Sequence, residues 1–137
     1  MPFQVSWYIE NEIIYMSSLG EVAANDVREA ILSTKRLMDS SSKQLVHVIV
    51  DVGHIVQPMS VKDMIGVLRE MGPHERAGWH IMLQEQTRLV TMGTAIATSL
   101  FKFRTRSLDT IEEAEAFLKE IDPTLSWEKT NKSILVR

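Results

Sequence analysis

Residues 45–52 read LVHVIVDV, a stretch in which almost every side chain is apolar and most are β-branched. An apolar run of this length without polar alternation is typical of a strand covered on both faces, as in the middle of a parallel sheet. The stretch therefore predicts the central strand of the fold, ending around the polar Asp51. Elements on either side of it in the sequence should form layers on it.

The segment before this strand predicts an antiparallel hairpin and a helix. Apolar side chains alternate along residues 3–9, and a second apolar run, residues 13–16, follows across a polar turn. Alternation around a short turn is a hairpin signal. Apolar residues then recur at helical spacing over residues 27–38, with Asn25 or Asp26 as the cap of that helix.

The segment after the strand predicts a loop and a second helix. Residues 53–59 form a short loop that contains Pro58, and Ser60 occupies the position of a helix cap. Asp63 lies three residues after Ser60, as in a variant of the capping box. Apolar residues at helical spacing over residues 61–71 complete this helix.

Two further strands and two further helices complete the pattern. Residues 78–83 predict another core strand, and residues 87–101 predict a helix of unusually small side chains. Residues 109–121 predict a last helix, which turns Glu115 and other acidic side chains outward. Between the two helices lies a predicted edge strand with one wet face, and its basic residues are Lys102, Arg104 and Arg106.

The predicted order of elements is β-β-α-β-α-β-α-β-α. Strands that alternate with helices after an opening hairpin imply parallel crossovers attached to one antiparallel edge. We therefore expect an α/β fold with a mixed sheet of four or five strands and helices packed on it. The chain has 137 residues, enough for one domain. We assign residues 1–122 to that domain and residues 123–137 to a C-terminal tail.

Composition excludes several classes of function. The absence of cysteine excludes disulfides, thiolate zinc sites and cysteine nucleophiles. Fifteen basic and eighteen acidic side chains give a net charge of −3, which disfavours binding to nucleic acid. The N-terminus lacks the basic start and apolar stretch of a signal peptide, and no window approaches the ~20 apolar residues of a membrane span. We expect a cytoplasmic protein without a membrane span.

The histidines give no metal-ligand pattern. His47 and His80 fall inside predicted strands, where an imidazole is typical of the core. His54 lies near Asp51, which leaves an Asp-His pair or a metal site as an alternative, but no second ligand cluster accompanies it. Motifs of nucleophilic hydrolases, phosphate loops and dinucleotide sites do not occur in the sequence. We expect no enzyme, no catalytic residue, no metal and no cofactor.

Residues 48–60, VIVDVGHIVQPMS, resemble the corresponding segment of the STAS domain, the fold of bacterial anti-sigma-factor antagonists and of sulfate-transporter cytoplasmic domains. The shared features are an apolar strand that ends in Asp51, a loop, and Ser60 nine residues later at the start of a helix. In that family the serine or threonine at this position is phosphorylated by a partner kinase. The resemblance covers about residues 3–122.

The neighbours of Ser60 differ from the family pattern. STAS domains usually carry an Asp before the phosphorylated residue and Ser-Gly after it, whereas this chain has Met59 before it and Val61-Lys62 after it. A closer likeness is to a small group of uncharacterised bacterial STAS-like proteins, which share the opening hairpin and a strand like that at Gly78. Those proteins are also similar in fold to the lipid-binding CRAL-TRIO domains.

The resemblance implies a non-catalytic regulatory module that binds a protein partner, such as an anti-sigma or kinase-type regulator, and is switched by phosphorylation of Ser60. The alternative for Ser60 is that it only caps its helix, which contributes about 1 kcal/mol. The alternative for Asp51 is that it fixes its own turn. The expected partner-binding rim comprises Asp51, His54, Pro58, Met59, Ser60, Lys62 and Asp63.

Two other functions stay open. A carrier of a small apolar or lipid-like ligand would hold it between the sheet and the helix of residues 87–101, against Met92, Ile96 and Leu100. An apolar stripe of this kind is also typical of core packing. The third interpretation is a plain homodimer that uses its helices or its tail as the interface.

Overall fold

The structure, a computed structural model, describes residues 3–57, 60–72, 74–84, 95, 99 and 103–135. Its centre is a five-stranded sheet in the order β1-β2-β3-β4-β5. The pair β1 and β2 is antiparallel and the other pairs are parallel, so the sheet is mixed. The elements are β1 (Phe3–Ile9), β2 (Ile13–Glu21), α1 (Ala24–Ser40), β3 (Val46–Gln57), α2 (Val61–Met71), β4 (Ala77–Leu83), β5 (Arg104–Leu108), α4 (Ile111–Ile121) and the short 3-10 helices η1 (Trp127–Lys129) and η2 (Lys132–Ile134).

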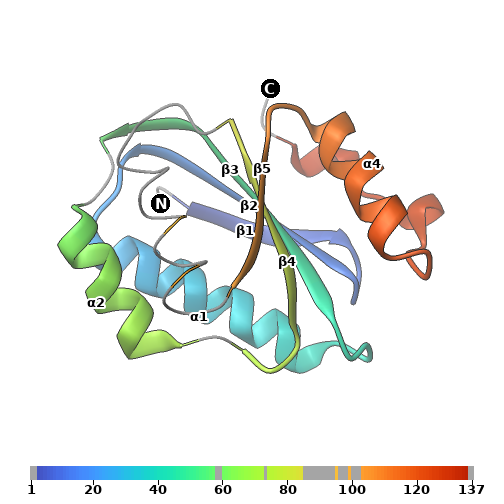
Figure 1. Cartoon of the computed structure of the whole chain (residues 1–137), viewed down its shortest axis with the longest axis horizontal. Helices are drawn as coiled ribbons and strands as arrows, with labels where there is room; N and C mark the ends of the chain where they lie inside the picture. The colour runs from blue at the N-terminus through green and yellow to red at the C-terminus, as the bar shows by residue number, and fades with distance from the viewer. Residues whose placement is uncertain are drawn as a thin grey trace.

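Helices cover both faces of this sheet. Figure 1 shows α1 and α2 on one side and α4 with the C-terminal segment on the other. Alternate residues of β3 supply the two cores: Val48 packs with Met38 of α1, and Ile49 packs with Leu118 of α4. Side chains on both faces of β3 are therefore buried, which explains why residues 45–52 are almost continuously apolar. The predicted mixed α/β sheet with a central third strand is confirmed.

The sheet edge formed by β5 matches the predicted edge strand. Arg104 and Arg106 are exposed there, while Lys102 lies outside the described residues. Most of the predicted helix of residues 87–101 also lies outside them. Ala95 and Ser99, which are described, are both helical.

The prediction that β3 ends near Asp51 and gives way to a loop is wrong. The strand continues to Gln57, because β2 is long enough to pair with it as far as the Glu21–Gln57 register. Pairing with β4 stops at the Asp51–Leu83 register. The last part of β3 therefore extends beyond its paired segment of β4.

Two local predictions on the helices are also wrong. The N-cap of α1 is Ala23, so neither Asn25 nor Asp26 occupies that position. The Asp26 carboxylate instead accepts a hydrogen bond from the Ala23 amide at 2.9 Å, which supplies the return half of a capping box. On α4, Glu115 is not an outward solvated charge, because the Tyr8 hydroxyl donates to its carboxylate at 2.5 Å.

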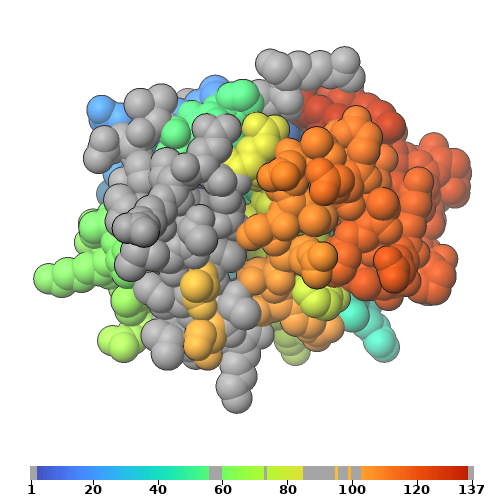
Figure 2. All heavy atoms as spheres, turned by 45° about the horizontal axis from the view of Figure 1, so that its top comes forward, coloured from blue at the N-terminus to red at the C-terminus, as the bar shows by residue number. Residues whose placement is uncertain are grey.

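The segment after α4 packs on the sheet as far as the described residues reach. Buried Glu12 accepts a hydrogen bond from the Ser126 amide at 2.8 Å, and the Tyr8 carbonyl accepts one from the Asn131 amide at 2.8 Å. Trp127 packs against the core beside α4. Figure 2 shows this segment and α4 together on one side of the molecule, with α2 on the opposite side. Residues that we assigned to a tail thus contact the core.

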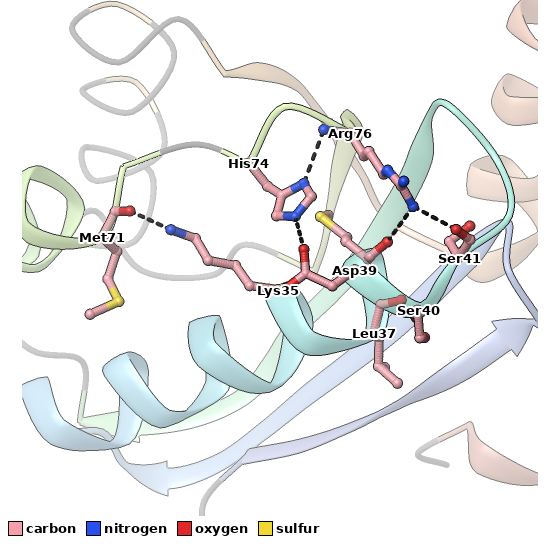
Figure 3. A network of polar contacts seen from close by, with 9 residues as sticks. Lys35, Leu37, Asp39, Ser40, Ser41, Met71, His74 and Arg76 are labelled. Carbon is pink, nitrogen blue, oxygen red and sulfur yellow. Dashed lines mark hydrogen bonds and ion pairs between the residues drawn. The ribbon is translucent and has the colours of Figure 1, made fainter.

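A polar network ties the carboxyl end of α1 to the segment between α2 and β4 (Figure 3). Arg76 donates to the carbonyls of Met38 at 3.1 Å and Ser41 at 2.5 Å, which caps the end of α1. His74 is 2.6 Å from the carboxylate of Asp39. These contacts hold the start of β4 against α1.

Among the helices of the described residues, none combines the length and apolarity needed to cross a bilayer.

Candidate functional site

Ser60 is the exposed N-cap residue of α2, just before Val61. It follows the carboxyl end of β3, and its hydroxyl accepts a hydrogen bond from the Asp63 amide at 3.2 Å. The predicted cap is confirmed. The amides of the first turn lack partners within the helix, so the positive end of the helix dipole lies beside this hydroxyl. Lys62 and Asp63 are exposed on the same turn.

An exposed apolar residue lies at the same edge of the sheet. Leu19, near the end of β2, is 48% exposed and sits opposite His54 in the β2–β3 register. Most large apolar side chains of the described sheet are at least partly buried, and Leu19 is an exception. A single exposed leucine is common on protein surfaces, so Leu19 does not by itself mark a contact surface. Sequence analysis missed it, since an alternating strand pattern does not tell which end of a strand is uncovered.

Asp51 does not belong to this surface. It is 2% exposed, and its carboxylate accepts hydrogen bonds from the Tyr15 hydroxyl at 2.9 Å and from the Gly53 amide at 3.0 Å. Gly53 is needed here, because a Cβ at this position would lie 2.8 Å from the Cβ of Gln84. The strand continues from Asp51 to Gln57 for ~20 Å, at about 3.3 Å per residue, so Asp51 lies well before the end of the strand that Ser60 follows. The prediction that Asp51 faces a partner beside Ser60 is therefore corrected.

His54 does not pair with Asp51. The two oxygens of the Asp51 carboxylate are already bonded to Tyr15 and Gly53, and the His54 ring makes no hydrogen bond with another described residue. Within the described part of the chain, no three His, Asp or Glu side chains gather in a way that could hold a metal ion. His54 remains at the edge as a partly exposed imidazole beside Leu19.

Several predicted site residues cannot be placed. Pro58 and Met59 of the rim lie outside the described residues. The same holds for Met92, Ile96 and Leu100, on which the apolar-ligand and dimer-face predictions depend. Those assignments stay predictions.

A second polar site, which the sequence did not reveal, lies at the amino end of β3. His47 is 2% exposed, and its Nε2 is 2.8 Å from the Asp122 carboxylate at the end of α4. Its Nδ1 accepts a hydrogen bond from the Trp79 amide at 3.0 Å. Because an amide can only donate, Nδ1 carries no proton, and the neutral ring donates from Nε2 to Asp122. Neither nitrogen is left for a metal or for proton transfer.

Two neighbours complete this site. Gly78 makes room for the imidazole, since a Cβ there would lie 2.5 Å from His47 Nδ1. Burial alone would raise the pKa of Asp122, but hydrogen bonds from Thr124 and His47 outweigh it and lower that pKa. Asp122 is therefore ionised at neutral pH. An imidazole inside an apolar strand was the available signal, because a buried polar group needs a partner.

His80 is the other histidine of the sheet, on β4. Its Nδ1 is buried and has no well-aligned hydrogen-bond partner among the described residues, and its ring meets Phe103 edge-on at 5.3 Å between centroids. Burial lowers the pKa of His80 to about 4, because the charged ring would lose its hydration. His80 is thus neutral at neutral pH. It does not belong to the surface around Ser60.

Comparison with known proteins bears on the fold. No family model matches the chain, and no curated protein matches it. Among solved structures, an uncharacterised protein of the DUF3478 family with a SpoIIAA-like fold, from Shewanella loihica, superposes with a TM-score of 0.58 at 12% identity, over 85% of this chain and 93% of that one. The anti-sigma factor antagonist SpoIIAA, in its unphosphorylated form, superposes with a TM-score of 0.57 at 14% identity, over 90% of this chain and 99% of that one.

These two matches cover almost the whole length of each similar protein. At 12% and 14% identity they show the fold alone. The STAS-like, SpoIIAA-like fold predicted from the sequence is confirmed. Function has to be argued from the site.

Proposed function

We propose that this chain is a non-catalytic regulatory module that binds a protein partner through the carboxyl end of β3 and is switched by phosphorylation of Ser60. We call the partner-facing surface the Ser60 rim, and it comprises Leu19, His54, Ser60, Lys62 and Asp63. Asp51 acts behind it, by holding Gly53 and Tyr15 in place. The proposed regulator is of the anti-sigma or kinase type.

The exposed Ser60 hydroxyl at the start of an eleven-residue helix is the observation that carries the proposal. A kinase must reach the hydroxyl that it modifies, and this one is reached from solvent. The likeness to SpoIIAA adds support, since that protein is an anti-sigma factor antagonist whose structure was solved in its unphosphorylated form. This likeness concerns the fold of the chain, in which Ser60 precedes α2.

A phosphate on Ser60 would change the rim through charge. It would add about −1.5 to −2 charges beside the first-turn amides, which favour an anion. The same charge would meet the Asp63 carboxylate, three residues on, and repel it. Lys62 lies on the same turn and provides a counter-charge. The modified rim would therefore present different charge to a partner without needing a change in the sheet.

Incubation of the full chain with ATP and an extract of its source cells, followed by mass spectrometry, tests the modification. We expect one phosphate on Ser60 and none in Ser60→Ala. Ser42→Ala is the matched control, because Ser42 is also exposed but lies between α1 and β3. A Ser60→Ala protein that is phosphorylated to the same extent as the unmodified chain would overturn the proposed switch.

Partner binding is tested separately by cross-linking in the same extract. Leu19→Ser removes the exposed apolar side chain of the rim and should reduce recovery of a cross-linked regulator. Leu32→Ser is the control, because Leu32 is 40% exposed on α1, away from the rim. Equal recovery with both variants would remove Leu19 and its edge of the sheet from the proposal.

A further inference from the structure

A pocket of about 360 Å³ opens at the opposite end of β3 from the Ser60 rim. We call it the amino-end pocket. It lies where β3, β4 and β5 begin, and the end of α4 closes one side of it; its walls include Lys43, His47, Trp79, Arg104 and Asp122. Its volume is at the lower end of the range of small-molecule sites, so it suits one small ligand.

The polar floor of this pocket is already satisfied. The Asp122 carboxylate accepts hydrogen bonds from His47 Nε2 at 2.8 Å, from the Thr124 amide at 3.1 Å and from the Thr124 hydroxyl at 2.5 Å. Three donors on one carboxylate spread its charge and hold it in place. His47 is neutral and has no nitrogen to offer. The floor therefore neither needs a cation nor supplies a reactive group.

The mouth of the pocket carries the opposite charge. Lys43 and Arg104 are both exposed, and neither side chain makes a hydrogen bond or ion pair with a described residue. With Asp122 ionised and His47 neutral, the charged side chains of the lining sum to +1, in a chain whose net charge is −3. Two unpaired cations beside a concave surface favour an anion.

The remaining walls are apolar. Trp79, Ile121 and Leu125 are partly buried and line the pocket. The Trp79 ring is held edge-on against Phe117, with 5.1 Å between centroids, so its position is fixed by packing. A fixed indole beside aliphatic side chains provides a surface for a flat apolar group.

We propose that the amino-end pocket binds a small organic anion, with a carboxylate or phosphate held by Lys43 and Arg104 and a flat apolar body against Trp79. This function is additional to that of the Ser60 rim and does not depend on it. The ligand binds as an effector or cargo, because Asp122 and His47, the polar groups of the floor, are already engaged in hydrogen bonds with each other, with Thr124 and with the Trp79 amide.

Titration of benzoate, phenyl phosphate and benzyl alcohol into the isotope-labelled full chain, followed by NMR, tests this proposal. Benzyl alcohol has the same ring without the charge. We expect at least one of the two anions to shift the Trp79 indole and the Arg104 amide saturably, with benzyl alcohol at least about fivefold weaker. Stronger binding of benzoate would identify a carboxylate ligand, and stronger binding of phenyl phosphate a phosphate ligand.

Variants then separate the pocket from general surface charge. Arg104→Gln and Lys43→Gln should each weaken binding of the anion about threefold to tenfold, as expected for one charged contact. Arg106→Gln is the matched control: it removes the same charge two residues along β5, where Arg106 lies over the Phe117 ring. Equal weakening by Arg106→Gln, equal binding of benzyl alcohol, or no saturable binding of either anion would overturn the proposal.

Discussion

At the amino end of β3, His47 is 2% exposed and both of its ring nitrogens are hydrogen-bonded, one to Asp122 and one to the backbone of Trp79. At the carboxyl end, Leu19 is 48% exposed and Ser60 faces solvent. Polar groups at the first end connect β3, β4 and α4, whereas those at the second end are presented outward. The difference teaches that buried, paired polar groups and exposed side chains occupy separate ends of one strand. The proposed phosphorylation of Ser60 would therefore change the charge of the rim away from these buried contacts.

The strongest test of this comparison is His47→Leu. The substitution leaves the Trp79 amide and the Asp122 carboxylate without their buried partner, and we expect a loss of about 4 kcal/mol in the free energy of unfolding. Urea denaturation followed by circular dichroism measures it. The control is His74→Leu, whose partner Asp39 has a side chain 71% exposed. Water can replace that bond, although the substitution also removes the bond that His74 accepts from the Arg76 amide at 3.0 Å. The loss should therefore be about 2 kcal/mol or less; similar losses for the two variants would contradict the comparison.

A fall in pH should lower the free energy of unfolding through His80 on β4. His80 has a pKa of about 4 in the folded protein, lowered by burial from the ordinary histidine value of 6.5. Between these values the unfolded chain binds a proton that the folded protein does not, so the free energy of unfolding is at its plateau above pH 6.5 and falls as the pH approaches 4. The fall should be on the order of 2 kcal/mol. Denaturation at pH 7 and pH 4.5 measures it, and His80→Phe should remove most of the difference; an unchanged difference would rule out His80 as its source.

A smaller effect is expected at Asp51, between the two ends. Tyr15→Phe removes the 2.9 Å hydrogen bond to the buried Asp51 carboxylate, which keeps its bond from Gly53. We expect a loss of about 1.5 kcal/mol, measured by thermal denaturation. If Tyr15→Phe costs as much as His47→Leu, stability is not concentrated at the amino end.

The smallest effect is expected at the rim. Ser60→Ala removes the N-cap of α2 and should cost about 1 kcal/mol, while Ser60→Asp should restore most of it, because aspartate caps helices as well as serine does. Hydrogen exchange should show faster exchange in the first turn of α2 only. Faster exchange throughout the sheet would show that the rim is coupled to the core after all.

Local patterns were enough to predict the helix cap at Ser60, because its signals lie close together in the sequence. Ser60 and Asp63 are three residues apart, and a cap with a following apolar stripe identifies a helix start by itself. The central strand was predicted for the same reason: most of residues 45–52 are buried, on both faces of the sheet, and all but His47 and Asp51 are apolar.

Non-local partners were the part that could not be predicted. His47 and Asp122 are 75 positions apart, so no window of sequence contains both. The true end of β3 depends on the length of β2, which pairs with it beyond Asp51. The position of Glu115 likewise depends on Tyr8, at the far end of the chain. In each case the hydrogen bond, strand end or side-chain position depends on an element far away in the sequence.

The ties between α1 and α2 have a mechanical consequence. The Arg28 guanidinium forms an ion pair with the Glu70 carboxylate at 2.8 Å, and the Lys35 ammonium donates to the Met71 carbonyl. Both contacts hold the last turn of α2 against α1. Ser60 lies at the other end of the helix. A force applied at Ser60 would therefore tilt α2 about its anchored last turn, and a small tilt there would produce its largest displacement at the first turn, beside Ser60.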